Sequence, residues 1–166
     1  IKNVFGLPCV VAVNAFPTDT AAELQLVEDK CRELGVRVAL SEVWAKGGEG
    51  GRALAQEVVR LCGQPSDFRY SYDLDGSIED KLEAICRRVY RADGVALTPA
   101  AKKQAQRLTE LGFGGLPICM AKTQYSFSDD PALLGAPRGF TVTVRNLKVS
   151  ACLLYTSPSP RDRSVS

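Results

Sequence analysis

The sequence predicts an α/β fold organised around parallel strands. Residues 8–14, Pro-Cys-Val-Val-Ala-Val-Asn, form a near-continuous apolar run, typical of a strand buried on both faces of a parallel sheet. A helical pattern follows, then a second apolar run at residues 36–40 and a second helical pattern at residues 52–62. Strand, helix, strand and helix in this order are the repeat of a parallel α/β fold.

The first helix has recognisable ends. Thr20 and Glu23 have the spacing of a capping box, so we expect the helix to begin after Thr20. Gly35 is a typical residue at a helix end. The apolar residues recur at helical spacing and predict one stripe, formed by Leu24, Val27, Cys31 and Leu34.

A Gly-rich stretch separates the second strand from the second helix. Residues 39–51, Ala-Leu-Ser-Glu-Val-Trp-Ala-Lys-Gly-Gly-Glu-Gly-Gly, hold the only tryptophan, Trp44, and four of the fourteen glycines. Gly-rich loops between a strand and a helix present backbone N–H groups to anions. Two interpretations stay open. The stretch forms one wall of a ligand site, or Trp44 caps a core and the glycines only make a tight turn.

Two loops leave the carboxyl ends of these two strands, where ligands bind in open α/β sheets. The first loop carries Asn14, Phe16, Pro17 and Asp19. The second loop carries Ser41, Trp44 and the glycines, directly after Leu40. Their common position at one sheet edge favours the interpretation as a ligand site.

The second half of the chain continues the α/β pattern. Residues 68–72 alternate like a short strand, and residues 73–76 form a turn. A capped helix is expected from Ser77 and Asp80, with an apolar stripe of Ile78, Leu82, Ile85 and Val89. Its basic residues Arg87, Arg88 and Arg91 indicate a solvated face rather than a ligand site.

Further strands and helices are expected after residue 93. Strands are predicted at residues 94–97, 116–121 and 139–149, the last from its period of two. Thr98 and Pro99 predict the start of a helix that ends at Gly112. A short helix is expected from Ser128 or Asp129 to about Gly135.

Three charged residues near the predicted strand at 116–121 have both a functional and a structural interpretation. Lys122 meets either an anion or a neighbouring carboxylate, because it stands at the carboxyl end of the strand. Asp129 and Asp130 precede Pro131 and are more simply helix caps than metal ligands.

The composition excludes several classes of function. The net charge of +2, without basic blocks that alternate with aromatics, argues against nucleic acid as a partner. No apolar run approaches the roughly 18 residues of a membrane span. The six cysteines form no C-x-x-C pair and indicate buried thiols in the cytoplasm. The lack of histidine excludes Ser-His-Asp catalysis and His-bearing zinc sites within these residues.

Residues 152–166 differ in composition from the rest of the chain. They are rich in Ser, Pro and Arg, so we expect a disordered tail outside the fold. The segment also resembles a translated sequencing-library adapter. At the other end, residues 1–6 lack the layout of a signal peptide and an initiator Met, so the chain is expected to be part of a longer protein.

Several long motifs resemble the formate–tetrahydrofolate ligase family. They are Val-Ala-Val-Asn-Ala-Phe-Pro-Thr-Asp-Thr at 11–20, the Gly-rich stretch at 39–51, and Pro-Ile-Cys-Met-Ala-Lys-Thr-Gln-Tyr-Ser-Phe-Ser-Asp-Asp-Pro at 117–131. Residues 93–94, 98–103 and 139–145 agree as well. The resemblance covers residues 1–151 in order.

The resemblance implies an edge of a P-loop-NTPase-type core, at residues 1–14, plus a C-terminal α/β domain at residues 15–151, incomplete at both ends. It implies a ligase, part of a homo-oligomer, that uses ATP with Mg²⁺ to formylate tetrahydrofolate with formate. The products are 10-formyltetrahydrofolate, ADP and phosphate, with formyl phosphate as the intermediate. No G-x-x-x-x-G-K-[ST] motif occurs here, so the phosphate-binding loop is expected upstream and the fragment alone is expected to be inactive.

The resemblance also implies site residues. The pterin ring is held between two aromatics in that family, which correspond to Phe16 and Trp44, with Pro17 and Leu40 lining the same pocket. Candidate nucleotide contacts are Asn14, Ser41, Gly47, Gly48 and Gly50. No catalytic residue or metal ligand is assigned. A non-catalytic folate- or protein-binding relic is the alternative. A nucleotide-dependent switch is disfavoured, because residues 14–19 depart from the N-K-x-D pattern.

Overall fold

The computed structural model describes residues 1–120, 125–150 and 153–157 and divides the chain into two compact units. Unit 1 is Ile1–Arg69 and unit 2 is Tyr70–Ser166. The expected boundary after residue 14 concerns domains of the family rather than this division, and it stays a prediction.

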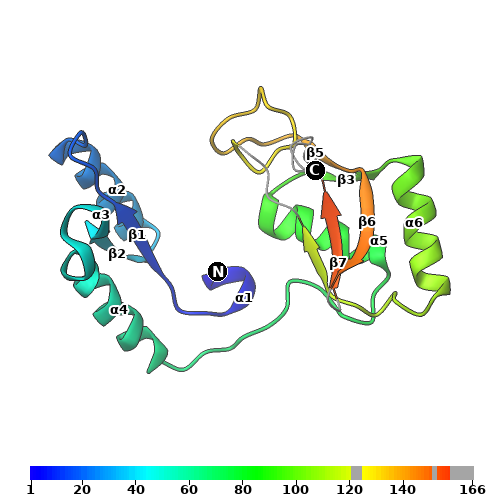
Figure 1. Cartoon of the computed structure of the whole chain (residues 1–166), viewed down its shortest axis with the longest axis horizontal. Helices are drawn as coiled ribbons and strands as arrows, with labels where there is room; N and C mark the ends of the chain where they lie inside the picture. The colour runs from blue at the N-terminus through cyan, green and yellow to red at the C-terminus, as the bar shows by residue number, and fades with distance from the viewer. Residues whose placement is uncertain (121–124, 151–152, 158–166) are drawn as a thin grey trace. The chain divides into compact units, whose positions relative to one another are not determined.

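Unit 1 contains the predicted parallel strand pair (Figure 1). Strand β1 (Val10–Asn14) pairs in parallel with β2 (Arg37–Ser41), in register from Val10↔Arg37 to Asn14↔Ser41. Helix α2 (Ala21–Glu33) connects them, and the short helix α1 (Lys2–Phe5) precedes them. The capping box is confirmed, because the Thr20 hydroxyl accepts from the Glu23 N–H and the Glu23 carboxylate accepts from the Thr20 N–H.

The Gly-rich stretch is helical rather than an open loop. It forms helix α3 (Val43–Lys46) and a 3₁₀ helix, η1 (Gly47–Gly51), which leads into the predicted helix α4 (Arg52–Cys62). The N–H of Glu42 donates to the carbonyl of Gly50 at 3.0 Å, which folds the stretch back on itself. A Cβ atom on Gly50 would lie 2.5 Å from the Glu42 backbone, so this close approach requires glycine.

The expected burial of β1 on both faces is not found within unit 1. The sheet has two strands, and Val11 is 37% exposed. Among the described residues of unit 1, Cys31 is the one buried hydrophobic residue. The expected stripe on α2 is therefore buried at Cys31 but exposed at Val27 and Leu34. A two-stranded sheet cannot cover both of its own faces, which is why the apolar pattern is present without the burial.

Unit 2 contains helical elements that the caps predicted. They are α5 (Ile78–Ile85), the single π-helical turn η2 (Cys86–Tyr90) and α6 (Pro99–Glu110). Ser77 and Asp80 form the expected capping box of α5, and the Thr98 hydroxyl accepts from the Ala101 N–H at the start of α6. The predicted stripe of α5 is confirmed, since Ile78, Leu82 and Ile85 are buried.

The strands of unit 2 form two small sheets. They are β3 (Gly94–Leu97), β4 (Ile118–Met120), β5 (Thr141–Val144), β6 (Asn146–Ser150) and β7 (Leu153–Ser157). One sheet pairs β3 with β5 in parallel. The other has the order β4-β7-β6, with β4 parallel and β6 antiparallel to β7. Two buried clusters lie against these sheets: Ile78, Leu82, Ile85, Ala101, Ala105, Ile118, Val144 and Leu147; and Cys86, Ala92, Phe140 and Val142.

Two predicted elements are absent from the described part of the chain. Residues 68–72 form no strand, because the Arg69 N–H donates to the carbonyl of Phe5, the last residue of α1, instead of to a strand. Residues 128–135 form no helix. The Ser128 hydroxyl accepts from the Asp130 N–H, and the Asp130 carboxylate accepts from the Ala132 N–H, so these groups cap local turns.

The last two predicted segments also differ. The strand expected at residues 139–149 is broken at Arg145, whose carbonyl accepts from the Thr98 hydroxyl, while the Leu147 N–H donates to Gln104. Within the expected disordered tail, residues 153–157 form β7, and residues 158–166 lie outside the described residues. The apolar and β-branched content of the tail is concentrated before Pro158. In the described chain no helix has the length and apolarity to cross a membrane.

Candidate aromatic site at the edge of the parallel strands

The candidate site lies where β1 and β2 end side by side. Asn14 and Ser41 are register partners at the carboxyl ends of the strands, and the Ala15 N–H donates to the Ser41 carbonyl at 3.0 Å. The first residues of the two following loops are therefore held next to each other. This parallel pairing brings together Phe16 and Trp44, which are 28 residues apart in the sequence.

Phe16 is held by a tight turn. The Phe16 N–H donates to the Asp19 carboxylate at 2.7 Å, and the Asp19 N–H donates to the Phe16 carbonyl at 2.9 Å. Pro17 occupies the second position of this turn, where its fixed φ is favourable. The ring of Phe16 is 53% exposed, so the turn presents an apolar ring to solvent.

Trp44 reaches the first loop from α3. Its indole Nε1 donates to the carbonyl of Ala15 at 3.2 Å, and the side chain is 59% exposed. The indole therefore does not cap a core of unit 1. Its ring lies beside that of Phe16, with centroids 6.1 Å apart and planes inclined by 28°. The result is a stacked aromatic pair at the surface of the sheet edge.

The space between the two rings is too small for a third ring. A sandwiched ring needs two stacking distances of about 3.5 Å each, or about 7 Å in all. The nearly parallel planes cannot be farther apart than the 6.1 Å between their centroids. Binding a flat ligand between Phe16 and Trp44 therefore requires the rings to separate by about 1 Å or more.

The other predicted residues of the site differ in their surroundings. Leu40 is partly buried on β2, Pro17 and Asn14 are exposed, and Ser41 is buried. Gly47 and Gly48 are exposed, and a Cβ on either would meet no atom within 4 Å. Gly50 packs against the Glu42 backbone and so has a structural reason to be glycine.

The charged residues that the sequence analysis considered in the second half of the chain belong to unit 2. Asp129 accepts weakly from the Thr143 N–H at 3.4 Å, and Asp130 caps a turn, not the helix that was expected. Arg87 pairs with Glu83, and Arg88 donates to the Ser71 carbonyl at 2.9 Å. Lys122 lies outside the described residues.

Sequence reasoning missed a buried lysine in unit 2. Lys81 is fully buried, and its ammonium donates to the carbonyls of Gly114 at 2.7 Å and Leu116 at 3.3 Å. Desolvation lowers the pKa of Lys81, while Asp75 and Asp73 act in the opposite direction. The signal was weak, because Lys81 stands next to Leu82 within a helix whose other polar positions are solvated.

The protein is of the α/β class, and its aromatic pair lies at the carboxyl ends of the parallel strands, the edge at which ligands bind in open α/β sheets. A family model described as formate–tetrahydrofolate ligase matches residues 1–157. The chain belongs to this family, which confirms the resemblance of its motifs. The family is one of ligases whose enzymes use tetrahydrofolate and ATP and act on small molecules.

Proposed function

We propose that this chain takes part in the ATP-dependent formylation of tetrahydrofolate by formate, with Phe16 and Trp44 as the stacking surfaces for the pterin ring. The observation that carries the proposal is the aromatic pair at the carboxyl edge of β1 and β2, in a chain of the ligase family. Pro17 and Leu40 extend the apolar lining. A flat heteroaromatic ring is the ligand chemistry that two near-parallel rings favour.

In this proposal, the central step of binding is the separation of the Phe16 and Trp44 side chains. Phe16 and Trp44 stack on each other without ligand, so the pterin replaces one aromatic contact with two. Asp19 anchors the Phe16 backbone, and the Ala15 carbonyl orients the indole. Rotation of the Phe16 side chain, which is exposed, opens the slot at the least cost, because it breaks no hydrogen bond of the turn.

The nucleotide part of the proposal concerns the neighbouring loops. Asn14 and Ser41 stand at the strand ends, and the open surroundings of Gly47 and Gly48 would allow close approach of a nucleotide. The proposal places β1 at the edge of a P-loop-NTPase-type core. The reaction would yield 10-formyltetrahydrofolate, ADP and phosphate through formyl phosphate. Mg²⁺ would neutralise the phosphates, but the described residues contain no group of three or more potential ligands, so we assign none to it.

The experiment uses Trp44 as its own reporter, because it is the only tryptophan of the chain. Titration with tetrahydrofolate is expected to quench the Trp44 fluorescence, whereas titration with ATP is not. Trp44→Ala should weaken tetrahydrofolate binding by roughly one to two orders of magnitude in calorimetry, because it loses a stacking contact and apolar area. Its effect on ATP binding should be much smaller.

Trp44→Phe is the matched control. It loses the hydrogen bond to Ala15 but keeps an aromatic face. Because stacking depends on this face, most of the tetrahydrofolate affinity should return. Equal losses of tetrahydrofolate and ATP binding in Trp44→Ala, or no recovery in Trp44→Phe, would contradict the stacking role.

A further inference from the structure

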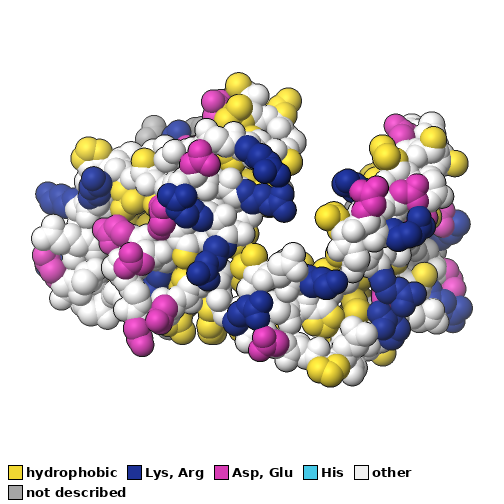
Figure 2. Space-filling view, turned by 180° about the vertical axis from the view of Figure 1, so that it is seen from behind, with side chains coloured by type: hydrophobic (Ala, Val, Ile, Leu, Met, Phe, Trp, Pro, Cys, Tyr) yellow, Lys and Arg dark blue, Asp and Glu magenta, His cyan; other side chains and the backbone are white. Residues whose placement is uncertain are grey.

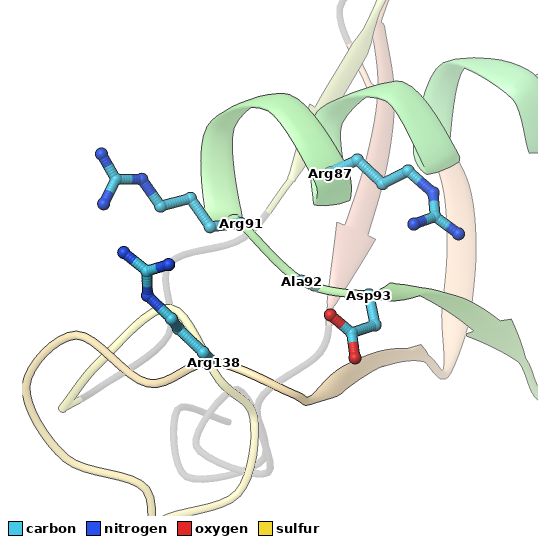
Figure 3. A pocket seen from close by; sticks show the side chains of 5 residues that line it. All are labelled: Arg87, Arg91, Ala92, Asp93 and Arg138. Carbon is cyan, nitrogen blue, oxygen red and sulfur yellow. The ribbon is translucent and has the colours of Figure 1, made fainter.

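Unit 2 contains a cavity whose wall carries an excess of positive charge (Figure 3). Its volume is about 470 Å³, and it is lined by Arg87, Arg91, Ala92, Asp93 and Arg138. The Asp93 N–H donates to the Phe140 carbonyl at 2.8 Å, which ties the segment before β3 to the segment before β5. The cavity is therefore built on two chain segments that are fixed to each other.

The arginines of this wall are not equivalent. The guanidinium of Arg87 is paired with Glu83, whose carboxylate also accepts from the Val95 N–H at 3.1 Å. Arg91 and Arg138 form no side-chain hydrogen bond or ion pair with any residue that the structure describes. In Figure 3 their guanidinium groups extend to the same side of the pocket, whereas that of Arg87 points away from them.

A second cavity of the chain shows the contrasting case. It lies in unit 1, has a volume of about 310 Å³ and also contains two arginines, Arg32 and Arg37. Arg32 pairs with Asp29 at 2.6 Å and Arg37 with Glu57 at 3.4 Å. The charge of that cavity is neutralised by carboxylates of the chain, whereas no residue that the structure describes pairs with Arg91 or Arg138.

The helix dipole explains only part of this arrangement. Arg91 is the C-cap residue of η2, and a cation at a helix C-terminus is stabilised by the partial negative charge there. Arg138 comes from the segment before β5 and belongs to no helix. Two like charges that face one pocket repel each other, so their proximity favours an anion between them.

We propose that Arg91 and Arg138 bind the phosphate group of a small molecule in this cavity. Each guanidinium offers a planar fork of donors that matches the oxygens of a phosphate. The volume is larger than one phosphate ion needs and lies within the range of small-molecule sites. The Asp93 carboxylate, in the same wall, provides an acceptor for a hydroxyl of the ligand and limits the total negative charge that the site accepts.

The test is calorimetric titration of the whole chain with inorganic phosphate and with glycerol 3-phosphate, at constant ionic strength. Binding of both is expected, with the ester tighter because it fills more of the cavity, and acetate should bind more weakly. The variant Arg91→Asn/Arg138→Gln should raise the dissociation constant about tenfold or more. The reason is that the loss of a single charged hydrogen bond already changes this constant by a factor approaching ten. Asparagine is chosen because Arg91 has a φ of 61°, which asparagine tolerates.

Two further variants distinguish binding in this cavity from non-specific attraction of phosphate to the positive charge of the chain. Lys102→Ala removes one exposed positive charge outside the pocket lining and should leave the affinity within about twofold. Asp93→Asn removes the negative charge of the wall and should tighten phosphate binding. If the double variant unfolds at a lower temperature than the wild type, the phosphate affinity of Arg138→Gln alone tests the proposal. This single variant should keep the fold, since Arg138 is an exposed residue of an irregular segment.

The proposal is overturned if the wild-type chain binds neither phosphate compound, or if Lys102→Ala weakens binding as much as the arginine variants. It is also overturned if the double variant, or Arg138→Gln where that variant decides, keeps the wild-type affinity. The residues of this site differ from those of the proposed ligase function, because Phe16 and Trp44 belong to unit 1. The arginine variants should therefore retain the quenching of Trp44 by tetrahydrofolate, so the two proposals can fail separately.

Discussion

Unit 1 and unit 2 have similar apolar patterns but bury them to different extents. Every buried hydrophobic residue of the described chain except Cys31 belongs to unit 2. Unit 1 instead exposes large apolar side chains on β1, α2, α3 and α4, among them Val11, Leu26, Trp44 and Val59. Figure 2 shows one face of the molecule, on which hydrophobic side chains reach the surface between charged ones.

The difference shows what an apolar pattern can and cannot predict. The run at residues 8–14 correctly predicts a parallel strand, because its residue types favour that backbone. Burial depends on how many elements surround the strand. Helix α5 has two sheets and α6 to pack against, whereas β1 has one partner strand. We therefore expect unit 2 to provide most of the stability of the chain.

The largest expected effect is a core substitution in unit 2 compared with the same substitution in unit 1. Leu82 is fully buried in the larger cluster, while Leu26 on α2 is 70% exposed. Leu82→Ala should lower the free energy of unfolding by about 2–5 kcal/mol through lost burial and a cavity. Leu26→Ala should change it by less than about 0.5 kcal/mol. Chemical denaturation measures both, and similar values for the two variants would refute the comparison.

A smaller effect is expected at Lys81, the charged residue inside the core of unit 2. Lys81→Ala leaves the Gly114 and Leu116 carbonyls without their donor, so we expect a loss of about 2–3 kcal/mol. A matched exposed control is Lys103→Ala on α6, which should be close to neutral. Denaturation of both variants at neutral pH provides the measurement.

The pH dependence of Lys81 has a defined sign. Its pKa is lowered in the folded state, so at alkaline pH the folded chain releases this proton before the unfolded chain does. Between the lowered pKa and the ordinary value of 10.5, the unfolded state binds more protons, and stability rises with pH. Lys81→Met should lack this contribution. An identical pH profile for the variant and the wild type would contradict the desolvation of Lys81.

The sequence predicted local features of both units better than it predicted long-range ones. The caps at Thr20, Ser77 and Thr98 are confirmed, because each depends on residues three positions apart. The helix expected after Ser128 is wrong, since the same hydroxyl and carboxylate groups also satisfy turns. The strand expected at residues 68–72 is wrong, because the Arg69 N–H finds its acceptor at Phe5.

The candidate sites show the same limit. The position of Phe16 near Trp44 follows from parallel strands, so it could be predicted once β1 and β2 were recognised. Their mutual stacking could not be predicted, because it depends on α3, which replaces the expected open loop. The meeting of Arg91 and Arg138 depends on the register of β3 and β5, which no local pattern specifies.

The reactivity of buried cysteines allows local unfolding to be compared between the two units. The expectation of buried thiols is wrong for Cys62 and Cys119, which are exposed, whereas Cys31 in unit 1 and Cys86 in unit 2 are buried. Desolvation raises the pKa of Cys86 to about 12, so its thiol stays protonated in the folded chain at pH 8. Iodoacetamide at pH 8 should modify Cys62 and Cys119 first, then Cys31, and Cys86 last.

The informative quantity is the ratio of the modification rates of the two buried cysteines, Cys31 and Cys86. Modification of a buried thiol requires local unfolding, which needs less free energy where few apolar contacts are lost. Cys31 should therefore react at least about tenfold faster than Cys86. Mass spectrometry of the modified chain gives both rates. Equal rates would mean that the units unfold together, and the comparison between them would lose its basis.

Apart from the exposed control positions Leu26 and Lys103, Trp44 is expected to have the smallest effect on stability, although ligand binding depends most on it in the proposed function. The indole is 59% exposed, so truncation removes little buried area and one hydrogen bond to Ala15. Trp44→Ala should therefore lower the free energy of unfolding by less than about 1 kcal/mol. Phe16→Ala should behave similarly, because the same stacked pair is lost. Thermal melts of both variants without ligand test this expectation. A loss of several kcal/mol would make the aromatic pair a structural part of unit 1 and would remove the separation between stability and binding.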